Sequence, residues 1–231
     1  MAHDILGTAL HDYRGKKSVS PLLLHTSYGD IEEMPVAVFF RKPADFPVLE
    51  RIALTHCYGK VLDIGAGAGS HALYLQQQGI AVQAMDISPG AAEVMRQRGV
   101  KQVTTVDFFQ YTDGEYDTLL FLMNGIGLAG DLNGLRKLLQ HCRQLLAPGG
   151  QLLFDSSDIA YLYADESVPK PADYYGQIGY QYEYRGKKGT PFSWLYIDQH
   201  TMHSLAGEAG WTMQVLYEDD NDQYLARLVS H

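Results

Sequence analysis

The chain has few cysteines, no excess of positive charge and no long apolar run. Its 231 residues include two cysteines, and 27 acidic side chains outnumber 18 lysines and arginines, for a net charge of −9. A binder of nucleic acid or of anionic membranes needs a basic face, so the composition argues against both partners. No segment is long enough to span a membrane and the N-terminus has no apolar signal core, so we expect a cytoplasmic protein.

Cys57 and Cys142 both lie on apolar patterns. This placement predicts two reduced core residues and neither a disulfide nor a metal site. We expect no metal ion elsewhere in the chain. The one small basic cluster, Arg185, Lys187 and Lys188, is predicted to be the solvated tip of a hairpin. A chain of this length without internal repeats is most simply one α/β domain with additions.

The most informative segment is KVLDIGAGAGSHAL, residues 60–73. An apolar strand ends in Asp63, glycines follow at Gly65, Gly67 and Gly69, and a helical pattern begins at once. Glycine has no Cβ and tolerates positive φ, so a ligand can approach the backbone of such a turn closely. The start of the helix offers unpaired N–H groups beside it. The segment therefore predicts a ligand site at a strand–turn–helix junction.

Two nucleotide-type ligands compete for this turn. Dinucleotide enzymes use G-x-G-x-x-G, but here the third glycine comes one residue early. A carboxylate at Asp63 would repel a pyrophosphate and would pair with an ammonium group. A ligand with an adenosine end and an amino-acid end satisfies both facts, and S-adenosylmethionine is such a ligand. The pattern D-x-G-x-G-x-G resembles motif I of the class I S-adenosylmethionine-dependent methyltransferases.

The next strand also ends in an acid, Asp86. A carboxylate at the tip of this second strand can accept both ribose hydroxyls of an adenosine, or it can cap a turn. Ser88 and Pro89 suit the cap and first turn of a helix that ends near Gly99. Ala66 in the glycine turn and Ile87 after the acid complete this part of the predicted cofactor site.

The third strand ends in Asp107, followed by Phe108 and Phe109. In the family that the chain resembles, this strand supplies an acid for the adenine amino group. The resemblance therefore assigns Asp107 to that amine and the Phe108 amide to a ring nitrogen. The alternative is that Asp107 caps a turn and that one of the two phenylalanines is a core residue.

The fourth strand ends at Met123 and is followed by Asn124. The resemblance places the end of this strand beneath the reactive methyl, so both residues are candidates for the methionyl part and Asn124 also for the acceptor. No proline pair follows Asn124, unlike in the enzymes that methylate DNA bases or glutamine amides. Gly125 and Gly127 either keep the backbone bare beside a ligand or, for Gly127, belong to a plain turn.

Three more site residues lie outside these motifs. Arg41 is a candidate for the cofactor carboxylate, with a surface ion pair as the alternative. Tyr28 is a candidate for the acceptor pocket. Ser157, beyond the fifth strand, either contacts the acceptor or, like Asp158, caps a short helix. The tyrosines near residues 174–184 are interpreted as half-buried sheet residues, with an aromatic cage as the alternative.

The order of elements predicts an α/β, Rossmann-like, doubly wound sheet of seven mostly parallel strands. The resemblance implies the strand order 3-2-1-4-5-7-6 with the last strand antiparallel. It covers residues 58–156 in good order, including an L-x-P-G-G segment before the fifth strand. We expect a helical or loop cap over the cofactor site at 1–57 and a methyltransferase core at 58–231, with an inserted hairpin region at 166–198.

The predicted function is methyl transfer from S-adenosylmethionine to a small-molecule acceptor by in-line displacement. Such an enzyme mainly aligns the reactants and excludes water, and it needs a general base only if the acceptor is bound protonated. No histidine has a positional argument for that role, so no catalytic residue is named. The alternatives are an NAD(P)-dependent Rossmann oxidoreductase and a non-enzymatic S-adenosylmethionine-binding protein. The acceptor and the oligomeric state do not follow from the sequence.

Overall fold

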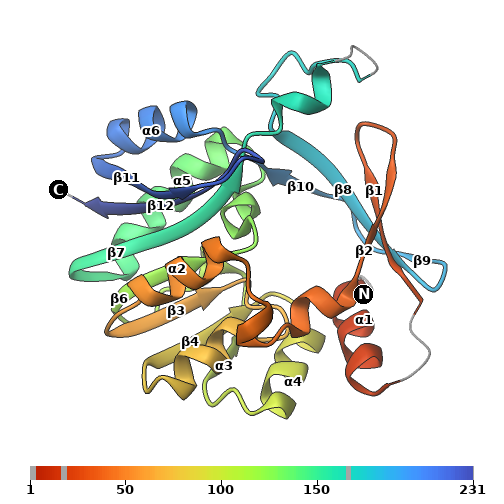
Figure 1. Ribbon diagram of the computed structural model, residues 1–231, viewed down its shortest axis with the longest axis horizontal. Helices are drawn as coiled ribbons and strands as arrows, with labels where there is room; N and C mark the ends of the chain where they lie inside the picture. The colour runs from red at the N-terminus through yellow and green to blue at the C-terminus, as the bar shows by residue number, and fades with distance from the viewer. Residues whose placement is uncertain (1–3, 17–19, 165–167, 231) are drawn as a thin grey trace. The chain divides into compact units, whose positions relative to one another are not determined.

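The computed structural model describes residues 4–16, 20–164 and 168–230 (Figure 1). The ends of the predicted ranges at residues 1–3, 166–167 and 231 lie outside this description. Within the described part, no helix has the length and apolar character needed to cross a bilayer. The chain divides into two compact units: unit 1 is Met1–Phe46, Leu62–Tyr111 and Gly179–Phe192, and unit 2 is Pro47–Val61, Thr112–Ile178 and Ser193–His231.

The helices and strands alternate through both units. Those within unit 1 are α1 (Ile5–Arg14), β1 (Leu22–Thr26), β2 (Ile31–Met34), α3 (Ser70–Gln77), β4 (Ala81–Asp86), α4 (Pro89–Arg98), β5 (Val103–Thr105) and β9 (Lys187–Lys188). Those within unit 2 are α2 (Val48–His56), β6 (Tyr116–Phe121), α5 (Leu132–Leu145), β7 (Leu146–Ser157), α6 (Gln199–Glu208), β11 (Trp211–Glu218) and β12 (Gln223–Ser230). Three strands have residues in both units: β3 (Lys60–Ile64), β8 (Gln177–Tyr184) and β10 (Phe192–Leu195).

Among the described residues, a seven-stranded sheet has the order β5-β4-β3-β6-β7-β12-β11. Numbered along the chain, this is 3-2-1-4-5-7-6, which confirms the predicted order. β4 and β5 are parallel, as are β6 and β7, whereas β12 runs antiparallel to both β7 and β11. In unit 2, Figure 1 shows β12 between β7 and β11, with helix α6 nearby. Apolar runs such as Val61–Leu62 are buried, as expected for a parallel strand covered on both faces.

Local signals fix the ends of the helices. Ser88 caps α4 by accepting a hydrogen bond from the Ala91 N–H, and α4 ends at Gly99, whose φ is +97°. Both features are those that the sequence predicted. The segment after α5 differs from the prediction. The L-x-P-G-G segment was expected before the fifth strand, but β7 already begins at Leu146. Its register with β6 shifts between Tyr116 and Thr118. The L-x-P-G-G residues thus form a bulged strand entry.

A second sheet has the order β10-β8-β1-β2, with β9 paired to β8. The sequence analysis expected only helices and loops before residue 58, so β1 and β2 are additions to that prediction. The inserted hairpin turns at Arg185 and Gly186, whose φ angles are +51° and +71°. Two successive positive φ angles make a tight two-residue hairpin turn. The turn therefore lies at residues 185–186, one residue before the segment 186–189 that the spacing of glycines and lysines indicates.

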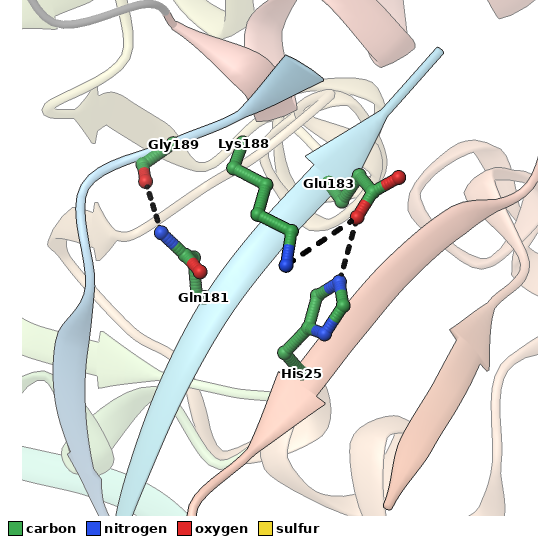
Figure 2. Close-up of polar contacts among 5 residues, drawn as sticks. All are labelled: His25, Gln181, Glu183, Lys188 and Gly189. Atoms are coloured by element: carbon green, nitrogen blue, oxygen red, sulfur yellow. Dashed lines mark hydrogen bonds and ion pairs between the residues drawn. The ribbon is translucent and has the colours of Figure 1, made fainter. Parts of the chain in front are cut away.

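Polar side chains of β1, β8 and β9 meet on the second sheet (Figure 2). His25 Nε2 lies 2.7 Å from Glu183 Oε2, and Lys188 Nζ lies 3.9 Å from the same oxygen. The Gln181 amide donates to the Gly189 carbonyl at 2.8 Å. These contacts place His25 in an ion-pair and hydrogen-bond network of the sheet.

The hairpin tip is exposed to solvent. Lys187 and Lys188 are exposed, as predicted. Arg185 is exposed as well, and its guanidinium also lies 2.8 Å from the buried carboxylate of Asp12 in α1. A buried carboxylate is stabilised by such a counter-charge, and removing one partner of the pair is costly. The basic cluster therefore connects the inserted hairpin to the N-terminal helix of the same unit.

Helix α1 packs on helix α4 within unit 1 (Figure 1). Ile5, Ala9 and Leu10 of α1 share a buried cluster with Ala91 and Val94 of α4. Apolar residues at this spacing form one face of a helix. The N-terminal segment is thus built onto the helix that follows the predicted ribose-binding acid.

Candidate functional site

Asp63 ends the first parallel strand as a buried acid. Its side chain is 2% exposed, and in the described part of the chain its Oδ2 atom has no hydrogen-bond partner. Burial raises the pKa of Asp63 from 3.8 to about 6, against the opposing effects of His71 and of the Ala72 N–H. A buried carboxylate oxygen without a partner is costly. It is suited to a ligand that brings a donor, such as an ammonium group.

The three glycines of the turn all have positive φ: +71° at Gly65, +56° at Gly67 and +79° at Gly69. They differ in what a side chain would meet. A Cβ at Gly65 would have nothing within 4 Å, whereas one at Gly67 would lie 3.0 Å from the Phe39 ring. A Cβ at Gly69 would lie 2.9 Å from Met95. Gly65 thus leaves open space, and the other two glycines serve packing within unit 1.

Asp86 closes the other side of the turn. Its Oδ2 accepts from the Gly67 N–H at 2.9 Å, and its Oδ1 accepts from the Ser88 N–H at 2.8 Å. Burial raises the pKa of Asp86 to about 6 despite these two donors, and the charges of Asp4 and Asp63 raise it further. Each carboxylate oxygen still has a lone pair for a further donor. Both predicted roles are therefore compatible: Asp86 ties down the turn and keeps capacity for ribose hydroxyls.

The third strand end matches the simpler alternative more closely. Asp107 accepts from the Phe109 N–H at 3.0 Å and caps a short 3₁₀ helix, Phe108–Gln110. Phe108 is buried and Phe109 is 38% exposed, so one of the two is a core residue, as predicted. Ile87 is 70% exposed, so its side chain is accessible to a ligand. Their contacts with an adenine stay predictions.

Arg41 and Tyr28 make local hydrogen bonds within unit 1. Arg41 is half-buried, and its Nε donates to the Val38 carbonyl at 3.0 Å. Tyr28 lies in the exposed turn between β1 and β2, and its hydroxyl donates to Glu32. Neither contact tests the predicted role of either residue.

In unit 2, the chain leaves β6 through a strained turn. Met123 has φ +61° and Asn124 has φ +55°, although neither is glycine. The Asn124 N–H donates to both carboxylate oxygens of Asp155, at 3.1 and 3.0 Å. Two adjacent residues in the left-handed region cost free energy and are held by such contacts. Backbone strain of this kind is enriched at functional sites, which supports the prediction for Met123 and Asn124.

Ser157 and Trp194 complete this turn. The Ser157 hydroxyl donates to the Asn124 side-chain oxygen at 3.3 Å, and the Trp194 indole N–H donates to the Asn124 carbonyl at 3.1 Å. A Cβ at Gly127 would overlap the Trp194 indole at Nε1. The backbone at Gly127 is therefore covered by an indole ring within the short 3₁₀ helix Gly125–Ala129, which favours the turn alternative over a backbone bare for a ligand.

Two tyrosines of unit 2 are paired with acids. Tyr174 donates to Asp198 at 2.6 Å, and Tyr175 donates to Asp158 at 2.7 Å. Burial, followed by these hydrogen bonds, raises the pKa of both tyrosines. Asp158 also accepts from the Ala160 N–H at 2.9 Å, just before the short helix Ala160–Tyr163, whose N-cap residue is Ile159.

Three residues of these networks were missed by the sequence analysis: Asp4, Asp155 and Trp194. Asp4 binds residues near Asp86, while Asp155 and Trp194 hold the strained turn at Asn124. The first two contacts join residues 84 and 31 positions apart. No local pattern marks an acid or an indole whose partner is that distant.

Fold and site together define a class of domain. It is a Rossmann-like domain whose antiparallel strand lies inside one edge of the sheet, and whose glycine turn lies between two buried strand-end acids. These acids suit a ligand that carries both an ammonium group and a ribose.

Comparison with known proteins agrees with this class. A family described as "Methyltransferase domain" matches residues 61–150. An S-adenosylmethionine-dependent methyltransferase from Bacteroides fragilis, solved in complex with S-adenosyl-L-homocysteine, is 41% identical, with a TM-score of 0.92 over 98% of this chain and 94% of that one. The CcbJ methyltransferase from Streptomyces caelestis shares the fold at 13% identity, with a TM-score of 0.62 over 84% of this chain and 94% of that one. The chain belongs to the S-adenosylmethionine-dependent methyltransferases, whose cofactor is S-adenosylmethionine.

Curated relatives match over a shorter stretch. The ubiquinone biosynthesis O-methyltransferase of Pasteurella multocida is 29% identical over 110 residues, which is 42% of this chain and 46% of the relative. A second relative, from Geobacillus, is 26% identical over 102 residues, which is 41% of its length. The chain thus matches less than half the length of either curated relative.

Proposed function

We propose that this protein transfers the methyl group of S-adenosylmethionine to a small-molecule acceptor. The observation that carries the proposal is the buried Asp63 carboxylate, whose Oδ2 has no partner among the described residues. An ammonium group would supply the missing donor and the compensating positive charge. The open space at Gly65 gives a ligand room beside this acid.

In this proposal, different residues of unit 1 contact different parts of the cofactor. Asp63 accepts from the amino group, and the turn at Gly65, Ala66 and Gly67 lets the ligand approach the backbone. Asp86 accepts from the ribose hydroxyls with the capacity that its two backbone donors leave. Ile87 and the segment at Asp107 and Phe108 are assigned to the adenine, and Arg41 to the carboxylate, by resemblance to the family.

Methyl transfer from a sulfonium requires the protein mainly to position the reactants. S-adenosylmethionine, when bound, supplies a methyl group on a positively charged sulfur. The protein has to hold the acceptor atom in line with that methyl and keep water out. The resemblance assigns Met123 and Asn124 to the methionyl part. A rigid turn with two positive φ angles, held by Asp155, suits this positioning role.

A small-molecule acceptor is supported by the net charge of the chain and by its similarity to a relative. The net charge of −9 disfavours a nucleic-acid acceptor. The Pasteurella multocida relative is named for ubiquinone biosynthesis, in which the product is a small molecule. Tyr28, Asn124 and Ser157 are the proposed acceptor residues. Both cysteines are buried thiols, which supports a reducing, cytoplasmic location.

The first test is ligand binding. Thermal unfolding is measured with S-adenosylmethionine, S-adenosylhomocysteine, NAD and NADP, each well above its expected dissociation constant. A ligand at 100 times its dissociation constant should stabilise the fold by about 2.7 kcal/mol. We expect the two sulfur compounds to raise the melting temperature. A shift with NAD or NADP alone would refute the proposal.

The second test identifies the acceptor class. The protein is incubated with methyl-labelled S-adenosylmethionine and separate pools of small phenols, amines and carboxylic acids, beside RNA, DNA and denatured protein. Label is expected in a small-molecule pool. Label found only in a macromolecule would contradict the acceptor proposed here. A reaction with Asp63→Asn is the control for enzyme-dependent transfer.

A further inference from the structure

One acid near the N-terminus accepts hydrogen bonds from two helices. Asp4 Oδ1 accepts from the Gly7 N–H of α1 at 2.9 Å, and Oδ2 accepts from the Gly90 N–H of α4 at 2.8 Å. Both oxygens also lie within hydrogen-bond distance of the Ser88 hydroxyl, at 2.9 and 2.8 Å. A helix cap serves one helix in the usual case. Asp4 therefore joins the starts of two helices that are far apart in sequence.

The two helix starts touch through glycine backbone. A Cβ at Gly90 would lie 2.7 Å from the Cα of Gly7, and a Cβ at Gly7 would lie 2.6 Å from the Ser88 hydroxyl. Larger residues at either position would force the helices apart. The close contact is what lets one carboxylate reach donors from both helices.

This joint leads directly to Asp86. The Ser88 N–H donates to Asp86 Oδ1 at 2.8 Å, and the Ser88 hydroxyl lies against Asp4. The other oxygen of Asp86 accepts from Gly67 in the glycine turn. A continuous set of hydrogen bonds thus runs from Asp4 through Ser88 and Asp86 to Gly67, all within unit 1.

We propose that Asp4 is a positioning residue of the cofactor site, which holds Ser88 and, through it, orients the Asp86 carboxylate for the ribose hydroxyls. The proposal rests on the proposed function, because it takes Asp86 as the ribose acceptor. Hydrogen-bond acceptors bind best when their own geometry is already fixed by a second set of contacts. Asp4 supplies such contacts from outside the motif that carries Asp86.

The competing explanation is that Asp4 only caps helices. Loss of a cap lowers stability but leaves the folded site unchanged. The two explanations differ in how cofactor binding depends on the ribose hydroxyls. If Asp4 acts through Asp86, its loss weakens the hydroxyl-dependent part of the binding. If it is only a cap, binding by the folded protein is unchanged.

The experiment compares two ligands on three proteins. The ligands are S-adenosylhomocysteine and its analogue that lacks the ribose 2′-hydroxyl, measured by calorimetry at a temperature where every protein is folded. The proteins are the wild type, Asp4→Ala and Asp131→Ala. Asp131 caps α5 by accepting from the Gly134 N–H at 2.6 Å, so its variant is a matched loss of a helix cap.

For Asp4→Ala we expect affinity for S-adenosylhomocysteine to fall about fivefold, the effect of weakening one charge-assisted hydrogen bond. Affinity for the deoxy analogue should change less, so the ratio of the two affinities falls. Asp131→Ala should leave both affinities and their ratio unchanged. Asp4→Asn keeps one side-chain acceptor and should give an intermediate ratio, which covers the case that Asp4→Ala does not fold.

The outcomes separate this inference from the proposed function. If the wild type does not bind S-adenosylhomocysteine, the proposed function fails. If the wild type binds and both Asp4 variants keep the wild-type ratio, Asp4 is only a helix cap and the inference is overturned. The inference is also overturned if Asp4→Ala and Asp131→Ala lower the affinities for both ligands by the same factor, because the effect would then be one of general stability.

Discussion

Replacing Asp63 by asparagine should stabilise the protein without cofactor while it weakens cofactor binding. The carboxylate is 2% exposed, and its pKa is raised to about 6 by burial. Asparagine has the same shape and no charge, so it removes the cost of burying the ionised form. It also removes the group that is proposed to pair with the ammonium of the ligand. Stability and function therefore make opposite demands on this position.

The size of the effect follows from the shift in pKa. A rise from 3.8 to about 6 is close to two units, and each unit corresponds to about 1.4 kcal/mol. The folded protein keeps its proton to higher pH than the unfolded chain, so stability falls as pH rises from about 4 to about 6. The penalty is about half of its full size at pH 5 and reaches about 3 kcal/mol at pH 8. The Asp63→Asn variant would not have this penalty at any pH.

Urea unfolding of the protein without cofactor, from pH 4.5 to 8, measures this difference directly. The free energy of unfolding of Asp63→Asn minus that of the wild type should grow with pH to about 6 and then stay constant. Any fixed cost of burying the new amide shifts this curve without changing its shape. Asp113→Asn, which changes an exposed acid, is the matched control and should show no such growth. A difference that is independent of pH would refute the reasoning about Asp63.

Two further predictions concern the strand-end acids and the glycine turn, and a third concerns the packing of Gly127 against Trp194. Affinity for S-adenosylhomocysteine should be constant from pH 8 to 7 and should fall below pH 6. The fall should be about tenfold per pH unit for each strand-end acid that must ionise. A flat calorimetric profile of affinity from pH 5 to 8 would contradict the raised pKa values of these acids. Gly65→Ala and Gly79→Ala should each lose about 1–2 kcal/mol of stability, because both glycines have positive φ. The two variants are matched, since both positions have open space for a Cβ. Only Gly65→Ala should weaken cofactor binding, and equal affinities would remove Gly65 from the site. Gly127→Ala should lower the free energy of unfolding by about 1–3 kcal/mol through overpacking, since its Cβ would overlap the Trp194 indole. The same overlap should change the tryptophan fluorescence, and a Trp194→Phe background should abolish this change.

The sequence predicted those parts of the fold whose cause is local. The ends of α4 were correct because Ser88 and Gly99 carry their own conformational signals. The strand order was correct through the resemblance to the methyltransferase family. The glycine turn was located correctly because it too carries a local signal. One of its glycines faces open space and the others face packed side chains, a difference that depends on tertiary contacts. Sequence spacing could not separate Gly65 from Gly69.

The strands before residue 58 show where local reasoning ends. β1 pairs with β8, and Leu23 lies opposite Glu183 across a large separation in sequence. A five-residue segment such as LLLHT becomes a strand only when such a partner is present. Because β1 depends on β8, the N-terminal cap and the inserted hairpin are one sheet. The sequence analysis had treated them as separate additions.

The buried acids of unit 1 that lower the stability of the protein without cofactor lie at the glycine turn. Asp63 and Asp86 are both buried, and the charges of Asp4 and Asp63 both raise the pKa of Asp86. Mutual repulsion of buried acids lowers the stability of the protein without cofactor most where all of them are ionised. A ligand that brings a positive charge and hydroxyl donors relieves this repulsion. The stabilisation by a fixed concentration of S-adenosylmethionine should therefore be larger at pH 8 than at pH 5, so that folding and cofactor binding are linked through the same protons.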